Sequence, residues 1–131
     1  MTEAGTMRSR VALLALAAGC GAFVAYSLAR MAATPSVLAS AWTLWALSPY
    51  LAVALLAFTL RGRASWWLLA ANAVALGAGP AAHWSMMRHP DAMDGIAAMI
   101  LPVYQGIVLF VAWVIALIRQ VRVARRPGGT A

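Results

Sequence analysis

Charge of either sign is scarce in this chain of 131 residues. It contains no lysine, only three acidic residues and a single cysteine. One cysteine cannot form an internal disulfide, so the sequence does not indicate disulfide or other redox chemistry. Charged residues make up 10% and hydrophobic residues 64%, which is more apolar than a soluble domain of this size can bury. We therefore expect a membrane protein.

The long apolar stretches themselves lack any Asp, Glu, Lys or Arg. Proton- and ion-coupled transporters bury ionisable groups along their pathway, so this absence argues against that class. It also argues against small four-helix drug/proton antiporters, which need a carboxylate in the first helix. No nucleophile–base pair, phosphate-binding glycine loop or pair of carboxylates is recognisable. We expect no enzymatic activity and no cofactor.

Charged residues divide the chain into four uncharged runs, each long enough for one membrane crossing of about 20 residues and none long enough for two. The runs show none of the ten-residue alternation of a transmembrane barrel. The predicted fold is an all-α membrane protein with four transmembrane helices in an antiparallel bundle. Residues 1–131 would form one integral membrane domain, ending in a short basic cytoplasmic tail at 119–131. The predicted helices are 11–29, 36–60, 64–82 and 96–118.

Three features mark the connections. Thr34 and Pro35 resemble an N-cap followed by a proline in the first helical turn. Arg61-Gly62-Arg63 leaves so little chain between the second and third helices that a tight antiparallel hairpin is expected. Residues 83–95 form the longest predicted connection, in which Asp91 or Asp94 would cap the fourth helix.

The distribution of arginine predicts the orientation. With four crossings, eight of the ten arginines share the side of both termini: Arg8, Arg10, Arg61, Arg63, Arg119, Arg122, Arg125 and Arg126. Positive residues concentrate on the cytoplasmic side, so both termini should be cytoplasmic. Arginine in place of lysine, with abundant alanine, indicates a GC-rich bacterial source and hence the inner membrane. Tryptophans near the predicted helix ends should lie at the membrane interfaces: Trp66, Trp67, Trp84 and Trp113.

The first helix has two possible fates. Its basic start and apolar centre resemble a signal peptide, and Cys20 lies in a segment similar to a lipoprotein signal. The stretch before Cys20 is short for that role, so we expect an uncleaved anchor. Small residues recur at spacings of three and four along this helix, a pattern that favours helix packing in lipid. They are Ala12, Ala15, Ala18, Ala22, Ala25 and Ala29. Ala71, Ala75, Ala78 and Ala82 form a similar stripe in the third helix.

A neutral polar layer is predicted near the middle of the membrane. Asn72 and Gln105 lie about 12 and 14 Å along their helices at 1.5 Å per residue, near the centre of a hydrocarbon core roughly 30 Å thick. An unpaired amide at that depth costs several kcal/mol, so each should face protein or water. The two side chains either join helices by hydrogen bonds or line a polar cavity. We favour the first interpretation.

Two further groups of side chains are candidates for binding. Imidazole and thioether groups of the third connection would suit copper(I): His83, Met86, Met87, His89 and Met93. Their spacing matches no compact metal motif, so we expect no metal there. Four arginines at the C-terminal end should contact anionic lipid headgroups rather than nucleic acid, because they adjoin a membrane exit: Arg119, Arg122, Arg125 and Arg126.

Three classes of function stay open on this reading. We favour a non-enzymatic accessory or scaffold protein that associates with other membrane subunits or with itself. The second class is a transporter or pore for a small neutral solute, with Asn72 and Gln105 along its path. The third is copper handling at the outer loop of methionine and histidine residues.

Overall fold

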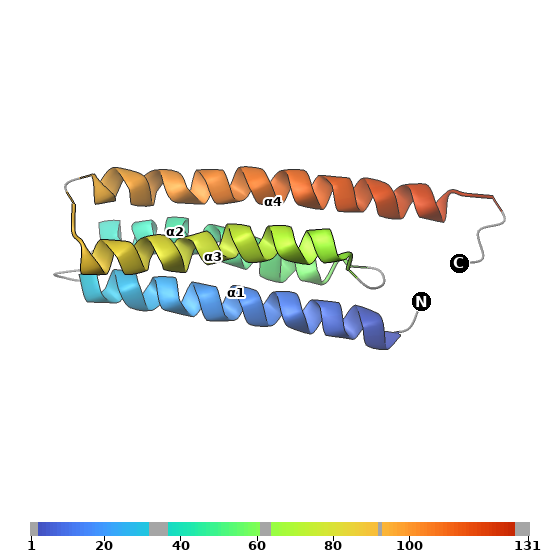
Figure 1. Cartoon of the computed structure of the whole chain (residues 1–131), viewed down its shortest axis with the longest axis horizontal. Helices are drawn as coiled ribbons and strands as arrows, with labels where there is room; N and C mark the ends of the chain where they lie inside the picture. Colours follow the sequence, from blue (N-terminus) through green and yellow to red (C-terminus); the bar gives the residue numbers. More distant parts are fainter. Residues whose placement is uncertain (1–2, 32–36, 61–63, 92, 128–131) are drawn as a thin grey trace.

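A computed structural model describes residues 3–31, 37–60, 64–91 and 93–127. These residues form four helices, α1 (Glu3–Met31), α2 (Val37–Ala57), α3 (Trp66–Arg88) and α4 (Asp94–Ala124). The helices lie side by side along the long axis of the molecule, and each runs opposite to the one before it (Figure 1). The prediction of an all-helical chain with four helices is confirmed.

The helix ends differ from the predicted ones because charged residues mark the limits of apolar runs but do not stop a helix. Arginine is a good helix former, so α1 begins at Glu3 and α4 continues to Ala124. Likewise, α3 continues to Arg88 through most of the predicted third connection. It stops before Pro90, since a residue that precedes proline disfavours the α conformation. The predicted capping role of Thr34 and Pro35 and the Arg61-Gly62-Arg63 connection lie outside the described residues, as do residues 128–131 of the tail.

The second and third helices are not the close neighbours that the short connection between them predicted. α1 packs against both α2 and α3, α4 packs against the same two helices, and α2 and α3 scarcely touch. The predicted tight hairpin of the second and third helices is therefore wrong. A short connection holds two helix ends near each other, but here α1 and α4 separate the faces of α2 and α3 over most of their length.

Large aliphatic side chains from all four helices form the core together with small residues, and they include Leu13, Val53, Leu76 and Leu109. The two alanine stripes differ in how far they are buried. In α3, Ala75 is buried, but in α1 the predicted stripe is exposed at Ala12, Ala15, Ala18, Ala22 and Ala29. Within this chain the α1 stripe therefore does not pack against the other helices, and helix packing through it in lipid stays a prediction. α1 instead turns inward a face that includes Ala17 and Gly21.

Within the described ranges, two helices are long and apolar enough to cross a membrane, residues Glu3–Arg30 of α1 and all of α4. The apolar part of α2, Ala41–Ala57, is shorter. Two such helices are weak evidence for a membrane location, so the number of crossings stays a prediction.

Candidate functional site

Tyr50 lies where all four helices meet. It comes from α2 and is only 4% exposed. Its hydroxyl donates a hydrogen bond to the Leu76 carbonyl of α3 at 3.3 Å and accepts one from Nε2 of Gln105 of α4 at 3.2 Å. On the opposite side, the Tyr50 side chain approaches α1 so closely at Gly21 that a Cβ there would lie 3.3 Å from the tyrosine Cβ. One side chain thus contacts or bonds to each of the other three helices.

The Gln105 side chain also joins α4 to α3. Its Nε2 donates a second hydrogen bond, to the Ala75 carbonyl, at 2.8 Å. Gln105 is 3% exposed, so these bonds form away from solvent. An amide nitrogen has two donor hydrogens, and both are used here.

Asn72 forms a second cross-link between the same two helices. It is fully buried, and its Oδ1 accepts a hydrogen bond from Nε1 of Trp113 in α4 at 3.2 Å. Its Nδ2 donates to the Leu68 carbonyl of its own helix at 2.8 Å. Asn72 and Gln105 therefore each bond to another helix, but through Trp113 and Tyr50 rather than to each other.

Trp113, which was expected at the membrane interface, is buried between helices. Its side chain is 2% exposed and lies in the core, where its indole N–H needs the acceptor that Asn72 supplies. Trp66 and Trp84, by contrast, are 80% and 51% exposed. Position near a helix end alone did not distinguish the buried tryptophan from the exposed ones.

Side-chain hydrogen bonds also compensate for two of the prolines inside the helices. Pro80 has no N–H to offer the Leu76 carbonyl, and Tyr50 of another helix supplies the missing donor. Pro49 leaves the Trp45 carbonyl without its helical donor, and the Ser48 hydroxyl bonds to it at 2.7 Å. Proline is tolerated in an apolar helix when a neighbouring group bonds to the freed carbonyl in this way.

Gly79 allows Tyr50 to reach α3. A Cβ at this position would overlap the tyrosine hydroxyl and would lie 3.2 Å from Nε2 of Gln105. Only a residue without a side chain leaves room for both polar groups. Sequence reasoning found Asn72 and Gln105 but missed Tyr50 and Gly79, for which the available signal was an adjacent proline in each case.

The candidate metal ligands are divided between interior and surface. Within α3, His83 and Met86 are buried and Met87 is half-buried. His89, at the C-terminal end of α3, and Met93, just before α4, are exposed. Nδ1 of His83 has no hydrogen-bond partner. Among the described residues, no three His, Cys, Asp or Glu side chains come together in a way that could hold a metal ion.

Asp91 and Asp94 order the short connection between α3 and α4. Asp94 accepts the backbone N–H of Asp91 at 2.8 Å, and Asp91 accepts that of Met93 at 3.2 Å. The N-cap residue of α4 is Met93, which forms no side-chain cap. The two carboxylates thus close a turn that precedes the helix instead of capping its first turn.

At the opposite end of the molecule, α1 holds the residues on both sides of positions 61–63. Nη2 of Arg10 donates to the carbonyls of Phe58 and Leu60 at 3.2 and 2.9 Å, and the Ser9 hydroxyl accepts the N–H of Ala64 at 2.9 Å. The α1 helix is therefore bonded at this end to the residues that flank positions 61–63.

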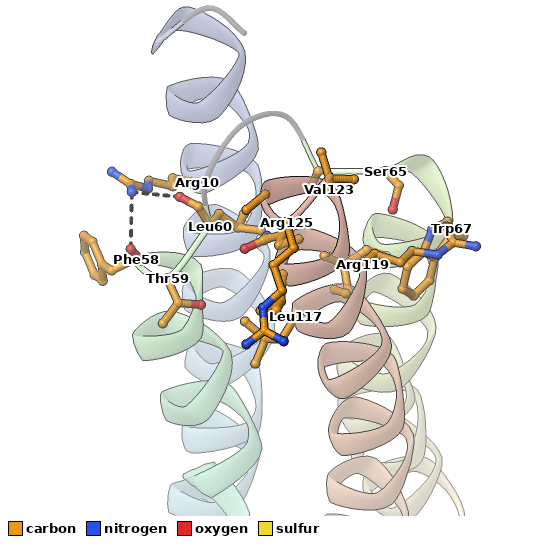
Figure 2. A pocket seen from close by; sticks show the side chains of 16 residues that line it. Arg10, Phe58, Thr59, Leu60, Ser65, Trp67, Leu117, Arg119, Val123 and Arg125 are labelled. Carbon is orange, nitrogen blue, oxygen red and sulfur yellow. Dashed lines mark hydrogen bonds between the residues drawn. The ribbon is translucent and has the colours of Figure 1, made fainter. Parts of the chain in front are cut away.

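A cavity of about 950 Å³ opens beside these bonds. Figure 2 shows Arg10 turned toward the end of α2, Arg119 turned toward Trp67, and Arg125 extended along α4 beside Leu117. Of the four C-terminal arginines predicted to contact lipid, Arg119 and Arg125 line this cavity, and Arg122 and Arg126 are exposed elsewhere on the same end.

No protein-family model matches the chain, and neither a curated protein nor a solved structure is significantly similar to it.

Proposed function

We propose that this chain is an integral membrane protein of the bacterial inner membrane that acts by association, as an accessory or scaffold subunit or as a homo-oligomer. Its four helices would cross the bilayer antiparallel to one another with both termini in the cytoplasm. The observation that carries this proposal is the use of the polar groups in the core. Tyr50, Gln105, Asn72 and Trp113 bond to one another and to helix carbonyls.

This use of polar groups favours a structural role over a solute path. A path for a neutral solute needs hydrogen-bonding groups that face the solute. In this chain both amide hydrogens of Gln105 and the donor of Tyr50 are already engaged by protein acceptors. Hydrogen bonds of this kind between membrane helices contribute about 0.6–2 kcal/mol each and hold a bundle together.

The outer surface supports the membrane location. Large apolar side chains of α4 are exposed along its length, including Ile107 at 56% and Phe110 at 71%. A soluble monomer rarely exposes a continuous apolar face of this size, so lipid or another membrane subunit should cover it. Asp91 and Asp94 lie at the end of the molecule opposite Arg10 and Arg119, which fits the orientation that arginine placement favours.

Membrane insertion and orientation can be tested with reporter fusions and alkaline extraction. Fusions after Gly62 and after Ala131 should report a cytoplasmic location, and a fusion at Asp91 a periplasmic one. The protein should stay in the pellet when membranes are washed with sodium carbonate at high pH. A periplasmic signal from the Ala131 fusion, or release of the protein by carbonate, would contradict the proposal.

The structural role can be tested against the pore by measuring solute flux. Liposomes that contain the purified protein should take up glycerol no faster than empty liposomes, and Asn72→Leu and Gln105→Leu should leave that rate unchanged while lowering stability modestly. Faster uptake that both substitutions abolish, in proteins that remain folded, would favour the transporter. Light scattering in mild detergent and purification from native membranes would then identify a self-associated form or a bound subunit.

A further inference from the structure

Tyr104 lies on the outer surface of α4 with its hydroxyl group unpaired. The residue is 65% exposed, and its hydroxyl forms no hydrogen bond with any residue that the structure describes. It lies ten residues from Asp94, where α4 begins, which corresponds to about 15 Å at 1.5 Å per residue. In the proposed membrane orientation this depth is near the centre of a hydrocarbon core roughly 30 Å thick.

Two other polar side chains on the outer surface bond to the chain itself. Nε1 of Trp45 in α2 donates to the Met99 carbonyl of α4 at 3.0 Å, and the Ser48 hydroxyl donates to the Trp45 carbonyl at 2.7 Å. Lipid tails offer no hydrogen-bond acceptor, and an unpaired hydroxyl is costly in an apolar medium. Tyr104 therefore points to an acceptor from outside this chain.

The apolar residues around Tyr104 form a regular line along the outer face of α4. Their positions alternate by four and three residues, a mean period of 3.5 that lets two helices pack along their length. They are Ile100, Tyr104, Ile107, Val111, Val114 and Ile118, all exposed except the half-buried Val114. The outer face of α4 is free for such packing, because this helix contacts α2 and α3 and lies at the edge of the bundle away from α1 (Figure 1). The apolar residues of the line suit lipid as well as another helix, so Tyr104 distinguishes the two.

We propose that α4 pairs along this line with α4 of a second copy of the chain, with the two Tyr104 hydroxyls hydrogen-bonded to each other. Copies inserted with the same orientation have parallel α4 helices, so a two-fold axis along the membrane normal brings equal residues together at equal depth. A hydroxyl both donates and accepts, so one Tyr104 can donate to the other. A single polar position of this kind also fixes the register of a helix pair. This inference rests on the proposed membrane location and names the surface through which the chain would associate with itself.

Disulfide cross-linking in native membranes tests the line of contact. Cys20→Ser removes the natural cysteine, and single cysteines are then introduced by Ile107→Cys on the line and by Val108→Cys beside it. Both positions are exposed, at 56% and 45%, but they differ by about 100° around the helix. After mild oxidation we expect about tenfold more disulfide-linked dimer from Ile107→Cys, because a disulfide needs Cα atoms within about 7 Å of each other. Equal yields at the two positions, or no dimer at either, would overturn the proposal.

The role of the hydroxyl is tested by Tyr104→Phe, with Tyr26→Phe as the matched control. Tyr26 is also exposed, at 56%, but it lies near the end of α1, where a tyrosine hydroxyl can reach water at the membrane interface. Förster transfer between labelled copies of the full chain in liposomes gives the dissociation constant of the dimer. We expect Tyr104→Phe to raise it about threefold, the equivalent of about 0.6 kcal/mol, and Tyr26→Phe to leave it unchanged. Equal effects of the two substitutions, or a wild type that does not associate, would refute the pairing.

Carbonate extraction of the same membranes separates this inference from the proposed function. Protein that stays in the membrane without a cross-link at Ile107→Cys would contradict only the pairing of α4, whereas release by carbonate would contradict the membrane location. Cross-linking of Ile107→Cys to a different protein would overturn the inference in favour of another subunit and would leave the accessory role intact.

Discussion

Replacing Gly79 with alanine tests whether Tyr50 holds the helices together. The added Cβ would overlap the Tyr50 hydroxyl, and it would lie 3.1 Å from Cζ of the same ring. The hydroxyl would have to leave both the Leu76 carbonyl and the Gln105 amide. Because Pro80 removes the helical donor of Leu76, that carbonyl would then lack a partner in a buried position.

The expected cost combines three contributions. Loss of two interhelical hydrogen bonds at about 0.6 kcal/mol each removes roughly 1 kcal/mol. Overpacking in a filled core costs a further 1–3 kcal/mol or so. Alanine in place of glycine inside a helix returns about 0.5–1 kcal/mol. Gly79→Ala should therefore destabilise the protein by about 1–4 kcal/mol, the sum of these ranges.

The control is Gly77→Ala in the same helix. A Cβ at Gly77 meets nothing within 4 Å, so this variant should gain the helix-propensity contribution and stabilise the protein by about 0.5–1 kcal/mol. Unfolding of both variants can be followed by circular dichroism as sodium dodecyl sulfate is added to mixed micelles. Combining Gly79→Ala with Tyr50→Phe removes the overlapping atom, so the double variant should be more stable than the two single effects add up to. If Gly79→Ala is as stable as Gly77→Ala, or if the double variant is simply additive, the role assigned to Tyr50 is wrong.

Three further substitutions probe other side-chain hydrogen bonds by the same unfolding measurement. Ser9→Ala leaves the buried N–H of Ala64 without an acceptor and should cost about 1–3 kcal/mol. Ser27→Ala should cost less, because Ser27 bonds only within its own helix, and equal losses would contradict this assignment. Trp45→Phe removes an exposed bond to the Met99 carbonyl and should cost under about 1 kcal/mol, so a larger loss than that of Ser9→Ala would refute the ranking.

The number of helices could be predicted because charges interrupt the apolar runs, but the neighbours of each helix could not. In helices that are apolar on nearly every side, hydrophobic periodicity carries little information about which face turns inward. The exposed alanines of α1 illustrate this: Ala15 and Ala18 fit a packing stripe in the sequence, yet Ala17 and Gly21 form the buried face. Alanine is too common here for its spacing to identify an interface.

Polar residues in the apolar segments were more informative because burying an unpaired polar group is costly wherever it lies. That cost made Asn72 and Gln105 recognisable as buried and bonded, although their partners depend on how the helices are arranged around the core. Tyr50 and Trp113 were harder to identify, since each can place its polar atom either at a membrane interface or in a core. The structure resolves the choice for both residues by supplying a partner inside the bundle.

The same cost explains why the polar cluster can define this particular arrangement of helices. Apolar contacts between helices that are apolar on all sides tolerate many rotations, whereas a buried hydroxyl or amide is satisfied in few of them. Rotation of α2 that carried Tyr50 away from Gly79 would leave the Leu76 carbonyl without a donor. Rotation of α4 would leave the side-chain amide of Gln105 without its acceptor on Tyr50. The hydrogen bonds are individually modest, but together they select one packing of the four helices over its alternatives. A fixed packing of this kind also keeps Arg119 beside Trp67.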